Sequence, residues 1–221
     1  MTKGVIFDIG GVLAHDVWEH LYLSVPNGIA SKYSLSAAAV EKVGKKLWKD
    51  FDKRKAELPD DSIGFEQEYW RKFKIEFPQL PNSVTVESLI EMTRDFIQPV
   101  NAEEMNPVLA RLKANGVSLA ICSNNNEFWF QRQWDKLQLN RFFSDDKVVL
   151  SCREGTTKAD QRLFKIAAMK LGLQMSECVF IDDRVENVDR ALQCGMTGIF
   201  FPPGSPVGAR YLDSILRKLG L

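Results

Sequence analysis

The chain has 221 residues, of which 45% are hydrophobic and 26% are charged, as in a typical soluble globular protein of one or two domains. Its 29 basic and 29 acidic side chains cancel to zero net charge, which argues against a broad basic face for nucleic acid. The apolar runs are too short to span a membrane, and Asp8 interrupts the first of them, so it cannot form a signal-peptide core. We therefore expect a cytoplasmic protein that binds neither nucleic acid nor membrane.

The sequence contains regions with two different secondary-structure patterns. A short apolar strand is predicted at residues 4–7, and the segment from about Trp18 to Gln98 is helical in pattern and rich in aromatic residues. From about residue 100 onward, short apolar runs alternate with amphipathic helices, which indicates parallel strands joined by crossovers. The later strands are predicted at 117–122, 147–150, 177–181 and 198–201, with helices at 102–115, 160–171 and 187–194 that each end at a glycine. This pattern predicts an α/β fold in which the first strand joins the later sheet and a helical lobe is inserted between them.

Polar side chains with catalytic potential follow the predicted strands. Asp8 follows the first strand, Ser123 the second, and Asp182 with Asp183 the fourth, while Lys158 lies in the loop after the third. Ligands of open parallel sheets bind beyond the carboxyl ends of the strands, so we expect these residues to converge on one pocket. Three neighbouring carboxylates repel one another and need a cation, and a set of oxygen ligands alone suits Mg²⁺ rather than zinc.

Each of these residues has an ordinary structural interpretation when taken alone. An Asp after a strand commonly caps a helix or forms a turn, Ser123 and Asn124 could cap the helix that follows, and a single lysine is usually solvated. It is their combination in this order and spacing that favours a functional site.

The order of the motifs resembles that of the haloacid dehalogenase-like (HAD) superfamily. The family's first motif, an apolar strand followed by Asp-x-Asp-Gly, corresponds to Val-Ile-Phe-Asp-Ile-Gly-Gly-Val-Leu at residues 5–13. Ser123 matches the second motif, Lys158 the third, and Asp182 with Asp183 the fourth. The resemblance covers the whole chain and implies a Rossmann-like core at residues 1–16 plus 100–221, with a helical cap at 17–99.

The resemblance also implies a reaction, namely Mg²⁺-dependent hydrolysis of a small phosphomonoester, with sugar phosphates among the candidates. Asp8 would attack phosphorus to give an aspartyl-phosphate, with Ser123 and Lys158 as the other catalytic residues. Ser123, Asn124 and Lys158 would bind the substrate. Asp8, the Gly10 carbonyl, Asp182 and Asp183 would hold the metal, and Asn187 would organise the last loop. The expected partner is a small phosphorylated metabolite, and the expected assembly is a monomer or a homodimer.

One position departs from the family pattern, because Gly10 replaces the second Asp of the first motif. That side chain normally acts as general acid and base, a contribution of about 10²–10⁴-fold. Three outcomes remain open. The substrate can carry a good leaving group, as anomeric, acyl and aryl phosphates do, and the resemblance to a sugar-phosphatase-like subgroup with Gly here favours this. Alternatively, His15 or Asp16 replaces the acid, or the chain has become a non-catalytic protein that binds a phosphorylated metabolite.

A second reaction also fits the superfamily, because its metal-independent 2-haloacid dehalogenases lack the second Asp too. Those enzymes usually carry an aromatic residue at that position and an arginine early in the cap. This chain has Gly10 and no arginine before Arg54. The presence of both Asp182 and Asp183 favours a metal site, and therefore the phosphatase.

Overall fold

Five parallel strands form one sheet in the order β3-β2-β1-β4-β5 in the computed structural model, which describes residues 2–15, 17–54, 62–100, 102–202 and 208–221. The strands are β1 (Gly4–Phe7), β2 (Ser118–Ser123), β3 (Val148–Leu150), β4 (Cys178–Asp182) and β5 (Thr197–Phe200). The first strand lies in the centre, paired with β2 on one side and β4 on the other. The parallel sheet and the entry of the first strand into it are confirmed, and no strand end is shifted by more than one residue.

Helices cover both faces of the sheet, which explains why its central strands are almost continuously apolar. On one face, α6 (Ala102–Ala114) and α11 (Gly208–Lys218) lie side by side and pack against alternate residues such as Val5 and Phe7. On the other face, α9 (Gln161–Lys170) and α10 (Val185–Gln193) pack against Ile6 and Phe180. Shorter elements complete this lobe: η1 (Leu139–Arg141), η2 (Asp145–Lys147), α8 (Ser151–Glu154) and η3 (Met175–Glu177).

Two helices of this lobe were not identified from the sequence. They are α11 and α7 (Glu127–Lys136), the latter of which begins where the Asn126 side chain accepts a hydrogen bond from the Trp129 backbone N–H. The short helix α8 was also missed, so Lys158 is separated from β3 by an extra turn of helix.

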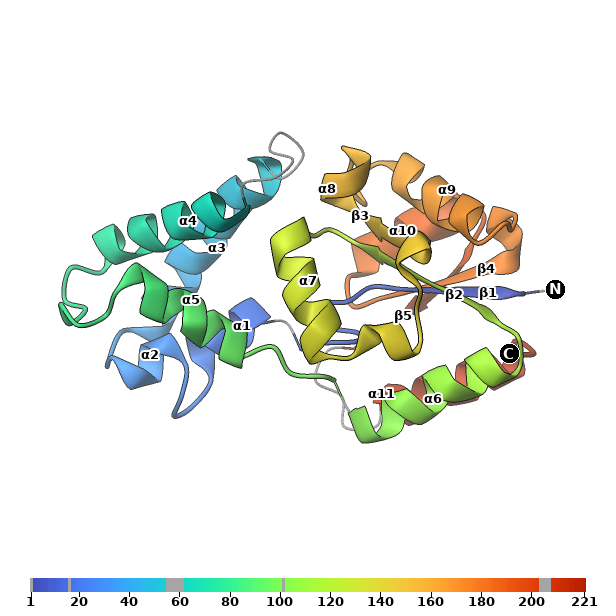
Figure 1. Ribbon diagram of the computed structural model, residues 1–221, viewed down its shortest axis with the longest axis horizontal. Helices are drawn as coiled ribbons and strands as arrows, with labels where there is room; N and C mark the ends of the chain where they lie inside the picture. Colours follow the sequence, from blue (N-terminus) through green and yellow to red (C-terminus); the bar gives the residue numbers. More distant parts are fainter. Residues whose placement is uncertain (1, 16, 55–61, 101, 203–207) are drawn as a thin grey trace.

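The segment between β1 and α6 forms a separate helical lobe, shown to the left of the sheet in Figure 1. It consists of α1 (Val17–Leu23), α2 (Ile29–Lys32), α3 (Ala37–Arg54), α4 (Ser62–Glu76) and α5 (Val86–Asp95). The lobe has its own apolar core, in which Trp70, Phe73 and Phe77 pack with ring centroids 5.3 and 4.8 Å apart. The helical insertion is therefore confirmed, and the aromatic residues that marked it in the sequence build its interior.

Two chain segments and one helix connect the lobes. The outgoing and returning segments pair with each other, since His15 N donates to Gln98 O at 3.0 Å and Val100 N donates to Leu13 O at 3.1 Å. Beside them, α7 of the sheet lobe contacts α4 of the helical lobe. In the described part of the chain, no helix combines the length and the apolar character needed to cross a membrane.

Candidate active site

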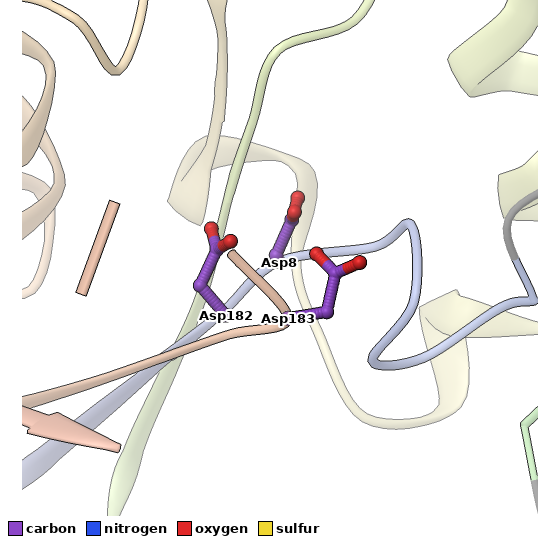
Figure 2. A group of neighbouring side chains, drawn as sticks. All are labelled: Asp8, Asp182 and Asp183. Atoms are coloured by element: carbon purple, nitrogen blue, oxygen red, sulfur yellow. The ribbon is translucent and has the colours of Figure 1, made fainter. Parts of the chain in front are cut away.

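The ends of β1 and β4 place three carboxylates close together. Asp8 follows β1, Asp182 ends β4, and Asp183 comes next, and in Figure 2 the three side chains rise from the same edge of the sheet. Each contributes one oxygen to a group whose members lie within 4.8 Å of one another. The convergence follows from the parallel register, which pairs Phe7 with Ile181 and so brings the residues after them together.

Lys158 supplies a buried positive charge to this group. Its Nζ lies 2.8 Å from Asp8 Oδ1 and 2.7 Å from Asp182 Oδ2, and the residue is only 1% exposed. Burial disfavours the ammonium, but the charges of Asp8 and Asp182 outweigh it and raise the pKa of Lys158 above its ordinary value. The lysine therefore stays charged, and its backbone N–H donates to Asn124 Oδ1 at 2.9 Å, which fixes the loop that carries it.

Asp182 differs from the other two carboxylates because both of its oxygens are engaged by the protein. Oδ2 pairs with Lys158, while Oδ1 accepts hydrogen bonds from Arg184 N at 2.9 Å and Asn187 Nδ2 at 3.0 Å. The side chain is fully buried. Asn187 thus holds the loop after the acidic pair, in the position expected for it.

Asp8 and Asp183 carry negative charge that a single lysine does not balance. Burial raises the pKa of Asp8 to about 6, with Lys158 opposing and Asp182 adding to the shift. Burial together with repulsion from Asp8 and Asp182 raises the pKa of Asp183 to about 7. Two hard carboxylate ligands that favour a further positive charge fit Mg²⁺.

The glycine pair of the first loop shapes the space around these carboxylates. Gly11 has φ +72°, and a Cβ there would lie 2.3 Å from Asp183 Cγ, so only glycine leaves room for that carboxyl group. At Gly10, by contrast, a Cβ would meet no described atom within 4 Å. Gly10 therefore borders open space, where the family's second Asp would project.

The loop after β2 carries a further polar group. Ser123 is 4% exposed, and beyond it Asn125 is held by Ser151, whose Oγ accepts from Asn125 N at 3.0 Å and donates to Asn125 O at 3.1 Å. Asn125 Nδ2 donates to Gln133 Oε1 at 2.7 Å. Asn125 and Gln133 were missed in the sequence, although the run of three asparagines after Ser123 marks an unusually polar loop.

These groups line a cavity of about 480 Å³ between the two lobes. The sheet lobe contributes Asp8, Gly10, Ser123, Asn124, Lys158 and Asp183, so every candidate site residue except the more deeply buried Asp182 borders it. His15 also lines it, whereas Asp16 lies outside the described residues. The helical lobe contributes Tyr22, Leu23, Trp48 and Lys49 to the lining, and α7 contributes Trp129 and Gln133.

Curated relatives include hydrolases of phosphate esters. The chain is 33% identical over 92 residues to mouse acyl-CoA dehydrogenase family member 10 (42% of this chain, 8% of the relative). It is 32% identical over 97 residues to flavin mononucleotide hydrolase 1 of Arabidopsis thaliana (44% of this chain, 38% of the relative). It thus spans less than half of either protein. Sesquiterpene phosphatase astK of Aspergillus oryzae is matched along most of its length, at 25% identity over 203 residues (89% of this chain, 88% of the relative).

Solved structures share the fold at low sequence identity. A defluorinating L-2-haloacid dehalogenase has a TM-score of 0.69 at 15% identity, covering 98% of this chain and 95% of the other. A HAD family enzyme of Bacteroides thetaiotaomicron in complex with magnesium has a TM-score of 0.63 at 15% identity, covering 95% and 98%. The family model for haloacid dehalogenase-like hydrolases matches residues 2–195. The resemblance seen in the sequence is confirmed, and the chain belongs to the haloacid dehalogenase-like hydrolases.

Proposed function

We propose that this hydrolase is a Mg²⁺-dependent phosphatase that cleaves a small phosphomonoester through an aspartyl-phosphate on Asp8. The observation that carries the proposal is the setting of the Asp8 carboxylate, which borders the cavity between a buried lysine and a second carboxylate, Asp183. A phosphatase needs this arrangement, because the nucleophile and the substrate are both anionic.

The Asp8 side chain is oriented for attack. Its Oδ1 accepts a hydrogen bond from Ile9 N at 2.7 Å and pairs with Lys158, whereas Oδ2 has no hydrogen-bond partner among the described residues. Oδ2 would form the bond to phosphorus as the ester oxygen leaves, and water would then hydrolyse the aspartyl-phosphate. The Ser123 hydroxyl, the Asn124 amide and Lys158 would hold the phosphoryl oxygens.

The metal would be held by Asp8, Asp183 and the backbone carbonyl of Gly10. Since the oxygens of Asp182 are occupied by protein donors, this residue would act through a water molecule and by positioning Lys158. Bound there, Mg²⁺ would shield the anionic phosphate from the anionic nucleophile.

We further propose that residues 17–99 act as the cap and residues 1–16 plus 100–221 as the catalytic core. The cavity lies between the two, so movement of the cap about the paired segments near His15 and Gln98 would open and close it. Closure would exclude bulk water and place cap side chains against the leaving group.

The open space beside Gly10 bears on the substrate class. Without a carboxyl group there, the leaving group has no acid at the usual place, and of the two alternatives His15 and Asp16, His15 lines the cavity. Substrates with good leaving groups, such as anomeric sugar phosphates, fit this site best. The names of two relatives, a flavin mononucleotide hydrolase and a sesquiterpene phosphatase, support a phosphate ester as the substrate.

The direct test is phosphate release from phenyl phosphate with Mg²⁺ and then with EDTA. We expect turnover with Mg²⁺ and its loss with EDTA. Dehalogenase neighbours share this fold, so chloride release from 2-chloropropionate is measured in parallel without metal. Chloride release that EDTA leaves untouched, without phosphate release, would replace the phosphatase with a dehalogenase. No product in either assay would leave the binding function, which a thermal shift with phosphorylated metabolites detects.

A further inference from the structure

Helix α7 places a buried amide side chain in the wall of the cavity, and the proposed chemistry does not use this amide. Gln133 is only 4% exposed, yet it lines the cavity together with Trp129, one turn earlier on the same helix. A buried amide that reaches a cavity either serves the protein's own hydrogen bonds or faces a ligand. Its hydrogen-bond partners decide between these roles.

A relay of hydrogen bonds determines which end of the amide faces the cavity. The Asn126 backbone N–H can only donate, and it donates to Asn125 at 3.0 Å, so the accepting atom is the Asn125 oxygen. The other end of Asn125 is therefore Nδ2, which donates to Gln133 at 2.7 Å. The Gln133 atom that accepts this bond must be Oε1, so Nε2 is left for another partner.

The Nε2 donor has no acceptor in the part of the chain that the structure describes. Nε2 makes no hydrogen bond to a described residue, and it is not among the buried side-chain atoms that lack a partner, so solvent reaches it. It therefore contacts the cavity, where a bound molecule can reach it. A ligand that displaces water from Nε2 without offering an oxygen leaves this donor unmet, which costs about 1–3 kcal/mol, so a ligand that does offer an oxygen is favoured.

We propose that Gln133 is a specificity-determining residue whose Nε2–H donates to an oxygen on the leaving group of the substrate. The inference rests on the proposed function, in which Ser123, Asn124 and Lys158 already serve the phosphoryl group. It names the substrate class as phosphomonoesters whose leaving group carries a hydroxyl or carbonyl oxygen, as sugar phosphates do. Trp129 adds an apolar surface beside this donor, against which a sugar ring can pack.

Two substitutions separate recognition of substrate from a purely structural role of Gln133. Gln133→Glu keeps an oxygen that accepts from Asn125 but has no donor, whereas Gln133→Met removes both. The readout is the ratio of kcat/KM for glucose 1-phosphate to kcat/KM for phenyl phosphate, because a general effect of charge or folding acts on both substrates. Gln131→Glu is the matched control, since Gln131 is exposed on the same helix and bonds Asp135.

We expect the ratio to fall about tenfold in both Gln133 variants, since a net hydrogen bond is worth about 1 kcal/mol or somewhat more, and to stay constant in Gln131→Glu. If Gln133 only secures the loop, Gln133→Glu keeps the wild-type ratio, and that result overturns the proposal.

Binding provides a readout that does not depend on turnover. The affinity for glucose 1-phosphate is compared between Asp8→Asn and the double variant Asp8→Asn/Gln133→Glu, with phenyl phosphate as the reference ligand. If the wild-type protein releases no phosphate, but Gln133→Glu weakens the binding of glucose 1-phosphate more than that of phenyl phosphate, the proposed function fails and the role of Gln133 stands. If turnover is normal and both the ratio and the relative affinities are unchanged, the role of Gln133 fails and the proposed function stands. If neither glucose 1-phosphate nor phenyl phosphate binds, the role proposed for Gln133 is also overturned.

Discussion

The sheet lobe buries a lysine among carboxylates, whereas the lysine–glutamate pairs of the helical lobe lie on its surface. In the sheet lobe, Lys158 and Asp182 are buried together at the strand ends. In the helical lobe, lysines such as Lys45 and Lys72 lie on the surface and pair with glutamates one turn away, while the interior is aromatic and aliphatic. Exposed pairs of this kind contribute little to stability, whereas a buried cluster is costly unless every charge is matched. The sheet lobe therefore keeps a buried charge cluster that is unfavourable for folding but suited to catalysis, whereas the helical lobe has an apolar core and serves to enclose the cavity.

The largest effect is expected from the nucleophile. Asp8→Asn keeps an oxygen that can accept from Ile9 N–H but removes the attacking carboxylate, so kcat for phenyl phosphate should fall by about 10³-fold or more. Circular dichroism should show an unchanged fold. Asp95→Asn, at the exposed end of α5 in the helical lobe, is the control. Undiminished turnover by Asp8→Asn would exclude the aspartyl-phosphate mechanism.

The next prediction concerns the contribution of the buried lysine of the sheet lobe to the free energy of unfolding. Lys158→Met leaves Asp8 and Asp182 facing each other without their cation, and this should lower the free energy of unfolding by about 3–5 kcal/mol. Lys72→Met, which breaks an exposed pair with Glu68 on α4, should cost less than about 1 kcal/mol. Urea denaturation of both variants measures the contrast. Equal losses of unfolding free energy in the two variants would show that the buried lysine of the sheet lobe contributes no more than an exposed lysine of the helical lobe.

The ion pair between the lobes predicts a dependence of stability on pH. Glu66 on α4 lies 3.0 Å from Arg132 on α7, and burial raises the pKa of Glu66 to about 7 although Arg132 opposes the shift. Because this pKa exceeds the unfolded value of about 4.5, the folded state retains a proton that the unfolded state has lost. The stabilising contribution of the protonated group is complete below pH 4.5 and disappears as the pH rises through 7.

Glu66→Gln should remove this dependence. The free energy of unfolding of the variant relative to wild type should therefore rise by about 3 kcal/mol between pH 4.5 and pH 8, at about 1.4 kcal/mol for each pH unit. Urea titrations at several pH values measure it, with Glu76→Gln at the exposed end of α4 as the control. A pH-independent difference would mean that Glu66 titrates in the folded protein as it does in the unfolded chain.

The smallest effect is expected from substitution of Gly10, in the loop after β1 that borders the cavity. Gly10→Asp adds a carboxyl group in space free of described atoms within 4 Å, so it should raise kcat for an alkyl phosphate such as glycerol 1-phosphate by about tenfold relative to phenyl phosphate. Gly10→Ala, which adds no acid, should show no such gain. A loss of activity with both substrates in Gly10→Asp would mean that position 10 must stay small for another reason, such as contact with the substrate.

Much of the sheet lobe could be predicted because its signals are local. Asp8 and Asp182 each follow a run of apolar residues, and chains of alternating strands and helices form parallel sheets, whose ligands gather at one edge. The helices α7 and α11 were harder to recognise, since α7 begins within a polar asparagine run and is amphipathic only in part. Gln133 could not be identified from its spacing, because nothing in the order of residues connects it to Asn125, eight positions earlier, or to the cavity.

The sequence by itself determined the family, the parallel sheet, the helical insertion and the residues at the strand ends, because these depend on hydrophobic periodicity and on motifs a few residues long. Only the tertiary structure decided how the three carboxylates divide. It left Asp8 Oδ2 without a partner among the described residues, enclosed Asp182 in hydrogen bonds, and set Asp183 against Gly11. It also decided that an amide of α7 faces the cavity that both lobes enclose. These properties depend on distances between segments far apart in the chain, which burial and hydrogen bonding set only when the whole molecule has packed.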